Sequence, residues 1–141
     1  MSQPFHEDGI SFVCPEGWSL EREPTDDGWT VTMQSPGTAF AMVRMDRSMT
    51  PVEDVVAATL EALRADYPEL DAANAIETIA GEMAVGHDVE FFSLDLSVTA
   101  WTRCFYGLAG TVLVLCQVSG ADDEEYEPAL RAICASMRSE E

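Results

Sequence analysis

The side chains in this sequence that could do chemistry are four cysteines and two histidines. Cys14, Cys104, Cys116 and Cys134 lie at least twelve positions apart, whereas zinc sites and redox pairs use cysteines about three positions apart. Each cysteine has apolar neighbours, as in FVC and LVLC. Because a free cysteine behaves as a small apolar side chain, we expect four buried, reduced thiols.

His87 is the histidine with possible chemical partners, because Asp88 and Glu90 follow it in the segment GHDVE. An imidazole beside carboxylates can bind a metal or act as a general base, and a thiol could join it in space. One hypothesis is therefore a small metal-binding protein or enzyme that uses His87, Asp88 and a thiol. The competing interpretation is an exposed histidine in a loop or at a strand start. His6 lies in a polar N-terminal stretch that we expect to be frayed.

Recognisable catalytic motifs do not occur in the sequence. We find no glycine-rich phosphate loop, no G-x-S-x-G elbow, no H-E-x-x-H and no EF-hand pattern. We therefore predict no catalytic residue, no metal and no cofactor.

Three tryptophans are candidate binding residues. Trp18 and Trp29 adjoin predicted turns, and Trp101 shares a strand face with Arg103 and Phe105. A tryptophan near a sheet edge can anchor a partner. Core packing is the alternative interpretation for each of them.

A run of acidic residues, DDEEYE at 122–127, gives the other candidate binding site. Asp123, Glu124 and Glu125 form its centre and could dock a basic segment of a protein partner. The same residues would also stabilise the start of a helix through its dipole. The sequence leaves both interpretations open.

The net charge is −19, from 26 acidic and 7 basic residues, and no lysine occurs. Such a surface repels phosphate backbones and anionic lipids, so we expect no nucleic-acid partner and no membrane binding. Genome composition, salt adaptation and an acidic docking face all remain possible explanations of the charge. The polar, acidic start MSQPFHEDG does not resemble a signal peptide, so we expect a cytoplasmic protein.

The elements that position these residues begin with a predicted antiparallel meander. Alternating or apolar patterns predict strands at 10–14, 18–23, 29–34 and 38–45. The segment PEG at 15–17 should reverse the chain so that Trp18 can pack. A second turn is expected at 24–28.

A helix is expected next, with Thr50 and Glu53 forming a capping box around Pro51. It should end before Pro68, because the residue preceding a proline avoids helical geometry. Its apolar stripe consists of Val52, Val55, Val56, Thr59, Leu60, Leu63 and Tyr67.

Long strands follow in the segments AIETIAG, AVGHDVEFFSLDL, VTAWTRCFYG and TVLVLCQVSG. The last is apolar on both faces, which predicts a central strand. A second helix should begin between 124 and 127, since Pro128 must lie in its first turn. The prediction is one α+β domain over residues 1–141, an antiparallel β-sheet flanked by helices on both faces in an α/β/α sandwich.

Four segments of this order resemble the PsbP-like fold group: ISFVCPEGW, TIAGEMAVGHDVEF, TVLVLCQVSG and YEPALRAICASM. That group includes the photosystem II extrinsic protein, a yeast Ran-binding nuclear import factor and bacterial DcrB-like proteins. The resemblance implies a fold and carries over no catalytic motif. Some proteins that resemble this fold act as chaperones for secreted effectors. Together with the acidic surface and the missing catalytic motifs, the resemblance favours a non-enzymatic adaptor or chaperone-like module whose ligand is a basic or apolar protein segment.

Overall fold

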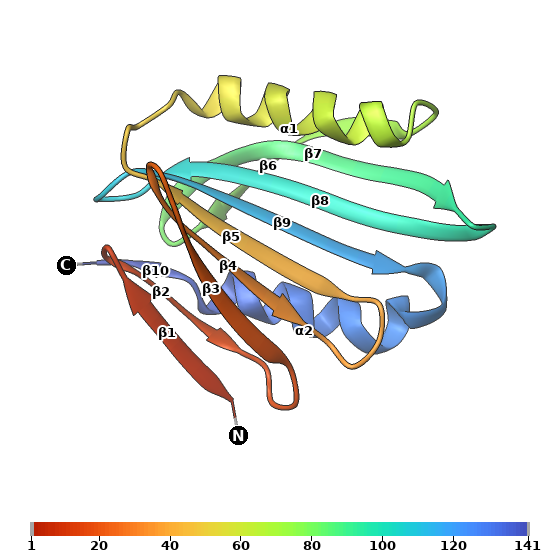
Figure 1. Ribbon diagram of the computed structural model, residues 1–141, viewed down its shortest axis with the longest axis horizontal. Coiled ribbons are helices and arrows are strands. Elements are labelled where there is room, and N and C mark those ends of the chain that lie inside the picture. The colour runs from red at the N-terminus through yellow and green to blue at the C-terminus, as the bar shows by residue number, and fades with distance from the viewer. Residues whose placement is uncertain (1, 141) are drawn as a thin grey trace.

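The computed structural model describes residues 2–140, apart from the side chains of residues 121, 123 and 124. Its larger sheet has seven strands in the order β3-β4-β5-β9-β8-β7-β6, and all neighbours are antiparallel (Figure 1). The strands are β3 (Ser19–Thr25), β4 (Gly28–Gln34), β5 (Phe40–Asp46), β6 (Asp71–Ile79), β7 (Glu82–Ser93), β8 (Leu96–Tyr106) and β9 (Thr111–Ser119). The predicted central strand is β9, which occupies the middle of this order.

A smaller sheet of three strands corrects two predictions. It contains β1 (Gln3–Glu7), β2 (Ile10–Cys14) and β10 (Arg138–Ser139), with β2 in the middle. Strand β2 was predicted within the meander, but it pairs with β1 and β10 instead. His6 lies in β1, so the expectation of a frayed terminus was also wrong. Alternation shows which face of a strand is buried, but it does not show which strand is its neighbour.

Two helices pack against different strands. Helix α1 (Val52–Asp66) packs on β7 and β8, whereas α2 (Asp123–Ser136) packs on β2 and β9 after a short 3₁₀ helix (Gly120–Asp122). In Figure 1, α1 lies above the larger sheet and α2 lies below it. No helix in the described part of the chain is long and apolar enough to cross a membrane.

The phase of α1 agrees with the predicted stripe, but its start does not. Val56 is buried, and the other apolar members of the stripe pack partly buried against two clusters on the sheet. The capping box is absent, because no side chain caps the helix from position 51. The backbone N–H of Val52 instead donates to the hydroxyl of Tyr106, 3.1 Å away on β8. A residue distant in sequence therefore satisfies one of the free amides at this helix start.

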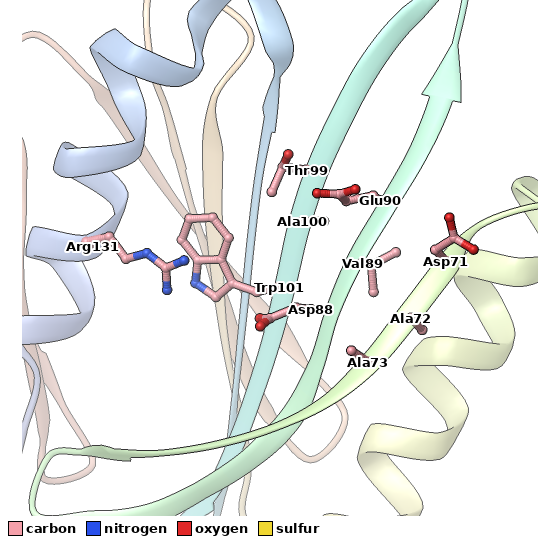
Figure 2. A pocket seen from close by; sticks show the side chains of 10 residues that line it. All are labelled: Asp71, Ala72, Ala73, Asp88, Val89, Glu90, Thr99, Ala100, Trp101 and Arg131. Atoms are coloured by element: carbon pink, nitrogen blue, oxygen red, sulfur yellow. The ribbon is translucent and has the colours of Figure 1, made fainter.

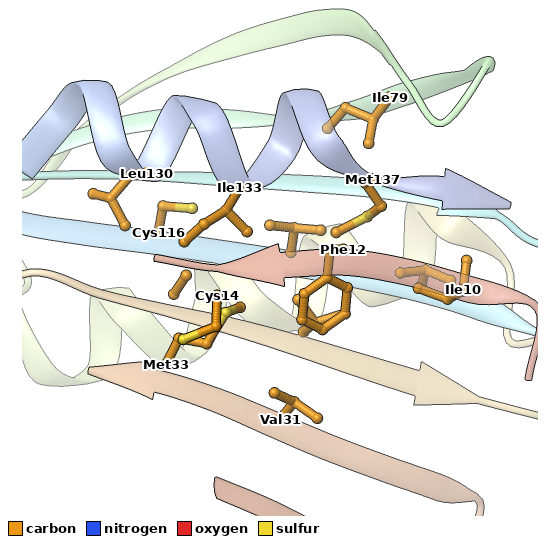
Figure 3. Close-up of a cluster of buried hydrophobic side chains, with 14 of the residues drawn as sticks. Ile10, Phe12, Cys14, Val31, Met33, Ile79, Cys116, Leu130, Ile133 and Met137 are labelled. Carbon is orange, nitrogen blue, oxygen red and sulfur yellow. The ribbon is translucent and has the colours of Figure 1, made fainter. Parts of the chain in front are cut away.

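The main core lies on the α2 side of the larger sheet. Strands β2, β4 and β9 and helix α2 all contribute to it, with Phe12, Val31, Cys116, Leu130 and Ile133 among its members (Figure 3). Because α2 covers the central strands, the outer strands β6 and β7 keep polar side chains on this face. That uncovered region forms the candidate site.

Candidate functional site

The structure does not bring His87 and Asp88 together. They are consecutive residues in the middle of β7, not in a loop, so their side chains point to opposite faces of the sheet. Asp88 accepts a hydrogen bond from Arg103, whereas His87 lines a groove beside α1 and its Nδ1 lacks a partner in the described residues. The same residues contain no cluster of three potential metal ligands.

All four cysteines are free thiols, as predicted; three are buried and Cys134 is half-buried. Burial, with the nearby carboxylates of Asp46 and Glu53, raises the pKa of Cys104 to about 12. A hydrogen bond with Cys116, assisted by the Trp101 indole, lowers the pKa of Cys134. Hence Cys134 is the thiol that ionises most readily in the folded chain.

Trp18 and Trp29 both pack into the protein. The backbone N–H of Trp18 donates to the Pro15 carbonyl at 3.2 Å, which closes the predicted turn, and its half-buried ring contacts Tyr126 edge-on. Trp29 is fully buried, and its indole N–H donates to Asp8 at 2.8 Å. Trp29 therefore offers no exposed surface to a partner in this conformation.

The acidic run surrounds the start of α2. The side chains of Asp123 and Glu124 lie outside the described residues, and Glu125 is exposed. Asp122 accepts hydrogen bonds from the Thr38 hydroxyl and backbone N–H at 2.6 and 2.9 Å, and these bonds lower the pKa of its carboxyl. Part of the run thus fastens the loop before β5 to the helix start.

Trp101 lies at the inner wall of a groove of about 370 Å³ between α2 and the outer strands (Figure 2). The guanidinium of Arg131, on α2, lies 3.9 Å from the centre of the indole ring and covers it. Trp101 is 1% exposed, and its Nε1 has no nitrogen or oxygen partner among the described residues. The indole face attracts cations because of its negative quadrupole.

The outer wall of this groove is acidic. Asp71, Asp88 and Glu90 line it, while Arg131 is the cation of the lining (Figure 2). The strand register explains the grouping, since Asp71 pairs with Glu90 and Asp88 pairs with Trp101. Asp71 and Glu90 have no ion-pair partner within the described part of the chain. We call this site the acidic groove.

Arg103 holds the strands beside the acidic groove together. Its side chain is 5% exposed and donates to Glu77 on β6 at 2.6 Å and to Asp88 on β7 at 2.7 Å. Gly86 lies opposite Arg103 in the register, and a β-carbon there would lie 1.8 Å from the Thr102 carbonyl oxygen. The guanidinium, carried by β8 and bonded to residues of β6 and β7, ties three strands together.

No sequence pattern indicated Arg131, Asp71 or Glu77. Arg103 stands in a largely apolar strand, which was a signal that it pairs with acidic residues. Its partners Glu77 and Asp88 could not be identified, because they depend on the strand register. Chemically, the carboxylate oxygens that line the acidic groove suit a cationic ligand. The acidic groove contains no thiol, hydroxyl nucleophile paired with a base, or set of metal ligands among the described residues.

No protein-family model matches the chain, and no curated protein matches its sequence. Solved structures do match along almost the whole length. Cyanobacterial PsbP (CyanoP) from Synechocystis is 10% identical with a TM-score of 0.63, and the match covers 98% of this chain and 92% of that one.

Two further solved structures match with similar sequence identity, coverage and TM-score. LpqN of Mycobacterium tuberculosis, described as involved in cell envelope biogenesis, is 11% identical with a TM-score of 0.58, covering 100% of this chain and 91% of its own. A protein of unknown function from Pseudomonas aeruginosa is 14% identical with a TM-score of 0.53, covering 96% and 94%. At these identities the likeness concerns the fold alone, and the chain has an α+β fold of the PsbP-like group.

Proposed function

We propose that this chain is a cytoplasmic, non-enzymatic protein-binding module, an adaptor or chaperone-like protein built as an α/β/α sandwich. Its acidic groove holds a basic segment of another protein. The observation that carries this proposal is the pair Asp71 and Glu90, two carboxylates without ion-pair partners beside the Arg131–Trp101 stack.

Electrostatics support a basic partner. The net charge of −19 attracts cationic segments and speeds their encounter, and it disfavours nucleic acid and anionic membranes. An incoming arginine or lysine would gain carboxylate partners at Asp71 and Glu90. The groove would then supply orientation in addition to general charge attraction.

The test is binding of a fluorescein-labelled nona-arginine peptide, followed by fluorescence anisotropy. Replacing both free carboxylates, Asp71→Asn with Glu90→Gln, should weaken binding about tenfold. The loss of each partly solvated charge pair costs roughly 0.2–1 kcal/mol of binding free energy, and a tenfold change corresponds to about 1.4 kcal/mol. Binding should also weaken as salt rises from about 0.05 to 0.5 M, because the Debye length shortens.

A matched control removes general charge effects. Asp26→Asn with Glu21→Gln also removes one aspartate and one glutamate, from exposed positions around β3. This variant should keep nearly the original affinity. Equal losses in both double variants would show that the peptide responds to net charge alone, and the proposed groove function would be rejected.

A further inference from the structure

Strand β6 is an open edge of the larger sheet. It is nine residues long, pairs with β7 on one side and has no strand on the other among residues 2–140. Outside the ladder with β7, its backbone makes no hydrogen bond in the described part of the chain. An unpaired edge of this length is a template for another extended chain.

The opposite edge of the same sheet is protected. Strand β3 has the sequence SLEREPT, in which charged residues and Pro24 discourage pairing. Arg22 on β3 is also held by Glu7 of β1 through two hydrogen bonds of 2.6 and 2.9 Å. Strand β6 contains no proline, lysine or arginine. Its segment DAANAI includes three alanines and one isoleucine, none of which discourages pairing.

The register predicts which groups of β6 point outward. Ala80 and Gly81 form a two-residue turn with positive φ angles, so Ile79 and Glu82 make a hydrogen-bonded pair. Pair types then alternate along the antiparallel ladder. The residues whose N–H and C=O groups face away from β7 are Ala72, Asn74, Ile76 and Thr78.

The two flanks of this edge differ in chemistry. One flank is the acidic groove, with Asp71, Asp88 and Glu90. The other is a groove of about 340 Å³ beside α1, where Val56, Ala57, Val85 and the 70% exposed Ile76 contribute apolar surface. A strand added here would present alternate side chains to an acidic and an apolar flank.

We propose that β6 accepts an extended segment of the partner as an additional strand, and that basic and apolar residues alternate in this segment. The inference rests on the proposed function and adds the conformation and pattern of its ligand. A second copy of the chain fits poorly, because the β6 edge of each copy carries Asp71 and Glu77 and is flanked by the acidic groove, so two such edges would bring like charges together. The net charge of −19 on each copy adds further repulsion.

Two probe peptides of identical composition test the pattern. One alternates five arginines with four valines, and the other carries the same residues as an arginine block followed by a valine block. Both carry the same net charge, and a groove that responds to charge alone gains nothing from alternation, so it should not favour the alternating peptide. Strand addition predicts that the alternating peptide binds about tenfold more tightly, because only it matches both flanks.

Amide hydrogen exchange locates the added strand. With the alternating peptide bound, the amides of Ala72, Asn74, Ile76 and Thr78 should exchange about tenfold more slowly, whereas the same amides should be unchanged by the block peptide. Equal affinities with no protection of these amides would overturn strand addition and leave the groove function standing. Absence of binding by either peptide and by nona-arginine would overturn both proposals.

Discussion

Arg103, Glu77 and Asp88 form an ion cluster, and we expect protein stability to depend most on keeping the buried Arg103 cation paired. The guanidinium is 5% exposed, whereas Glu77 and Asp88 are 38% and 56% exposed. Removing the cation therefore leaves two carboxylates that can reach water. Removing both carboxylate charges leaves a buried cation with neutral neighbours, which is the more costly arrangement.

The expected free energies of unfolding follow from these exposures. Arg103→Met removes two hydrogen bonds to partly solvated carboxylates and two to the backbone carbonyls of His87 and Thr102, so we expect a loss of about 1–2 kcal/mol. Glu77→Gln with Asp88→Asn keeps the shape of both acceptors but strands the buried guanidinium, and we expect a loss of about 3–5 kcal/mol. The double variant should be less stable than the single one by roughly 2 kcal/mol.

Urea unfolding followed by circular dichroism measures this difference. With a slope of about 2 kcal/mol per molar urea, a 2 kcal/mol difference shifts the midpoint by roughly 1 M. Asp71→Asn with Glu90→Gln removes two charges from the same strands without touching Arg103 and should shift the midpoint little. A larger loss of stability in Arg103→Met than in the variant Glu77→Gln with Asp88→Asn would refute the reasoning, because leaving the buried cation unpaired would then not be the more costly change.

Three further predictions concern other parts of the chain. Leu94 and Asp95 occupy the β7–β8 turn with φ angles of 53° and 66°, so Leu94→Asn with Asp95→Gly should stabilise the protein by about 1 kcal/mol in thermal unfolding, and an unchanged melting temperature would contradict this. Iodoacetamide should alkylate Cys134 before the other thiols, since its pKa is lowered and it is half-buried; Cys134→Ser should remove the first phase, and a surviving first phase would assign it elsewhere. Asp122 has a lowered pKa because Thr38 donates to it, so its contribution to stability is present above the unfolded carboxyl pKa of about 3.9 and is lost as the pH falls through the folded value. Thr38→Val should raise the pKa of Asp122 in an NMR titration and flatten the loss of stability below about pH 4; an unmoved pKa would show that the hydroxyl is not its cause.

Local patterns were sufficient for most elements. The stripe from Val52 to Tyr67 set the buried face of α1, Pro68 set its end, and the two-sided apolar run of β9 indicated its central position. These predictions succeeded because periodicity and proline geometry act over a few neighbouring residues. The burial of three thiols and the packing of Trp18 after its turn follow from the same local rules.

The candidate site could not be obtained in this way. The sequence singled out the tryptophans and the acidic run, yet Trp29 is fully enclosed and Asp122 is engaged by Thr38. Asp71 and Glu90 had no visible signal, because their proximity to Trp101 depends on the register of three strands.

Composition and spacing along single segments predict most element types, the faces that those elements bury and the strongly acidic surface, because each of these is a local property. Contacts between distant segments explain why β2 leaves the main sheet, why Tyr106 satisfies the start of α1 and why β6 ends the sheet as an open edge. Each of these outcomes is a choice of partner between distant segments. Such choices are made by the summed packing of the whole chain, which no short pattern contains.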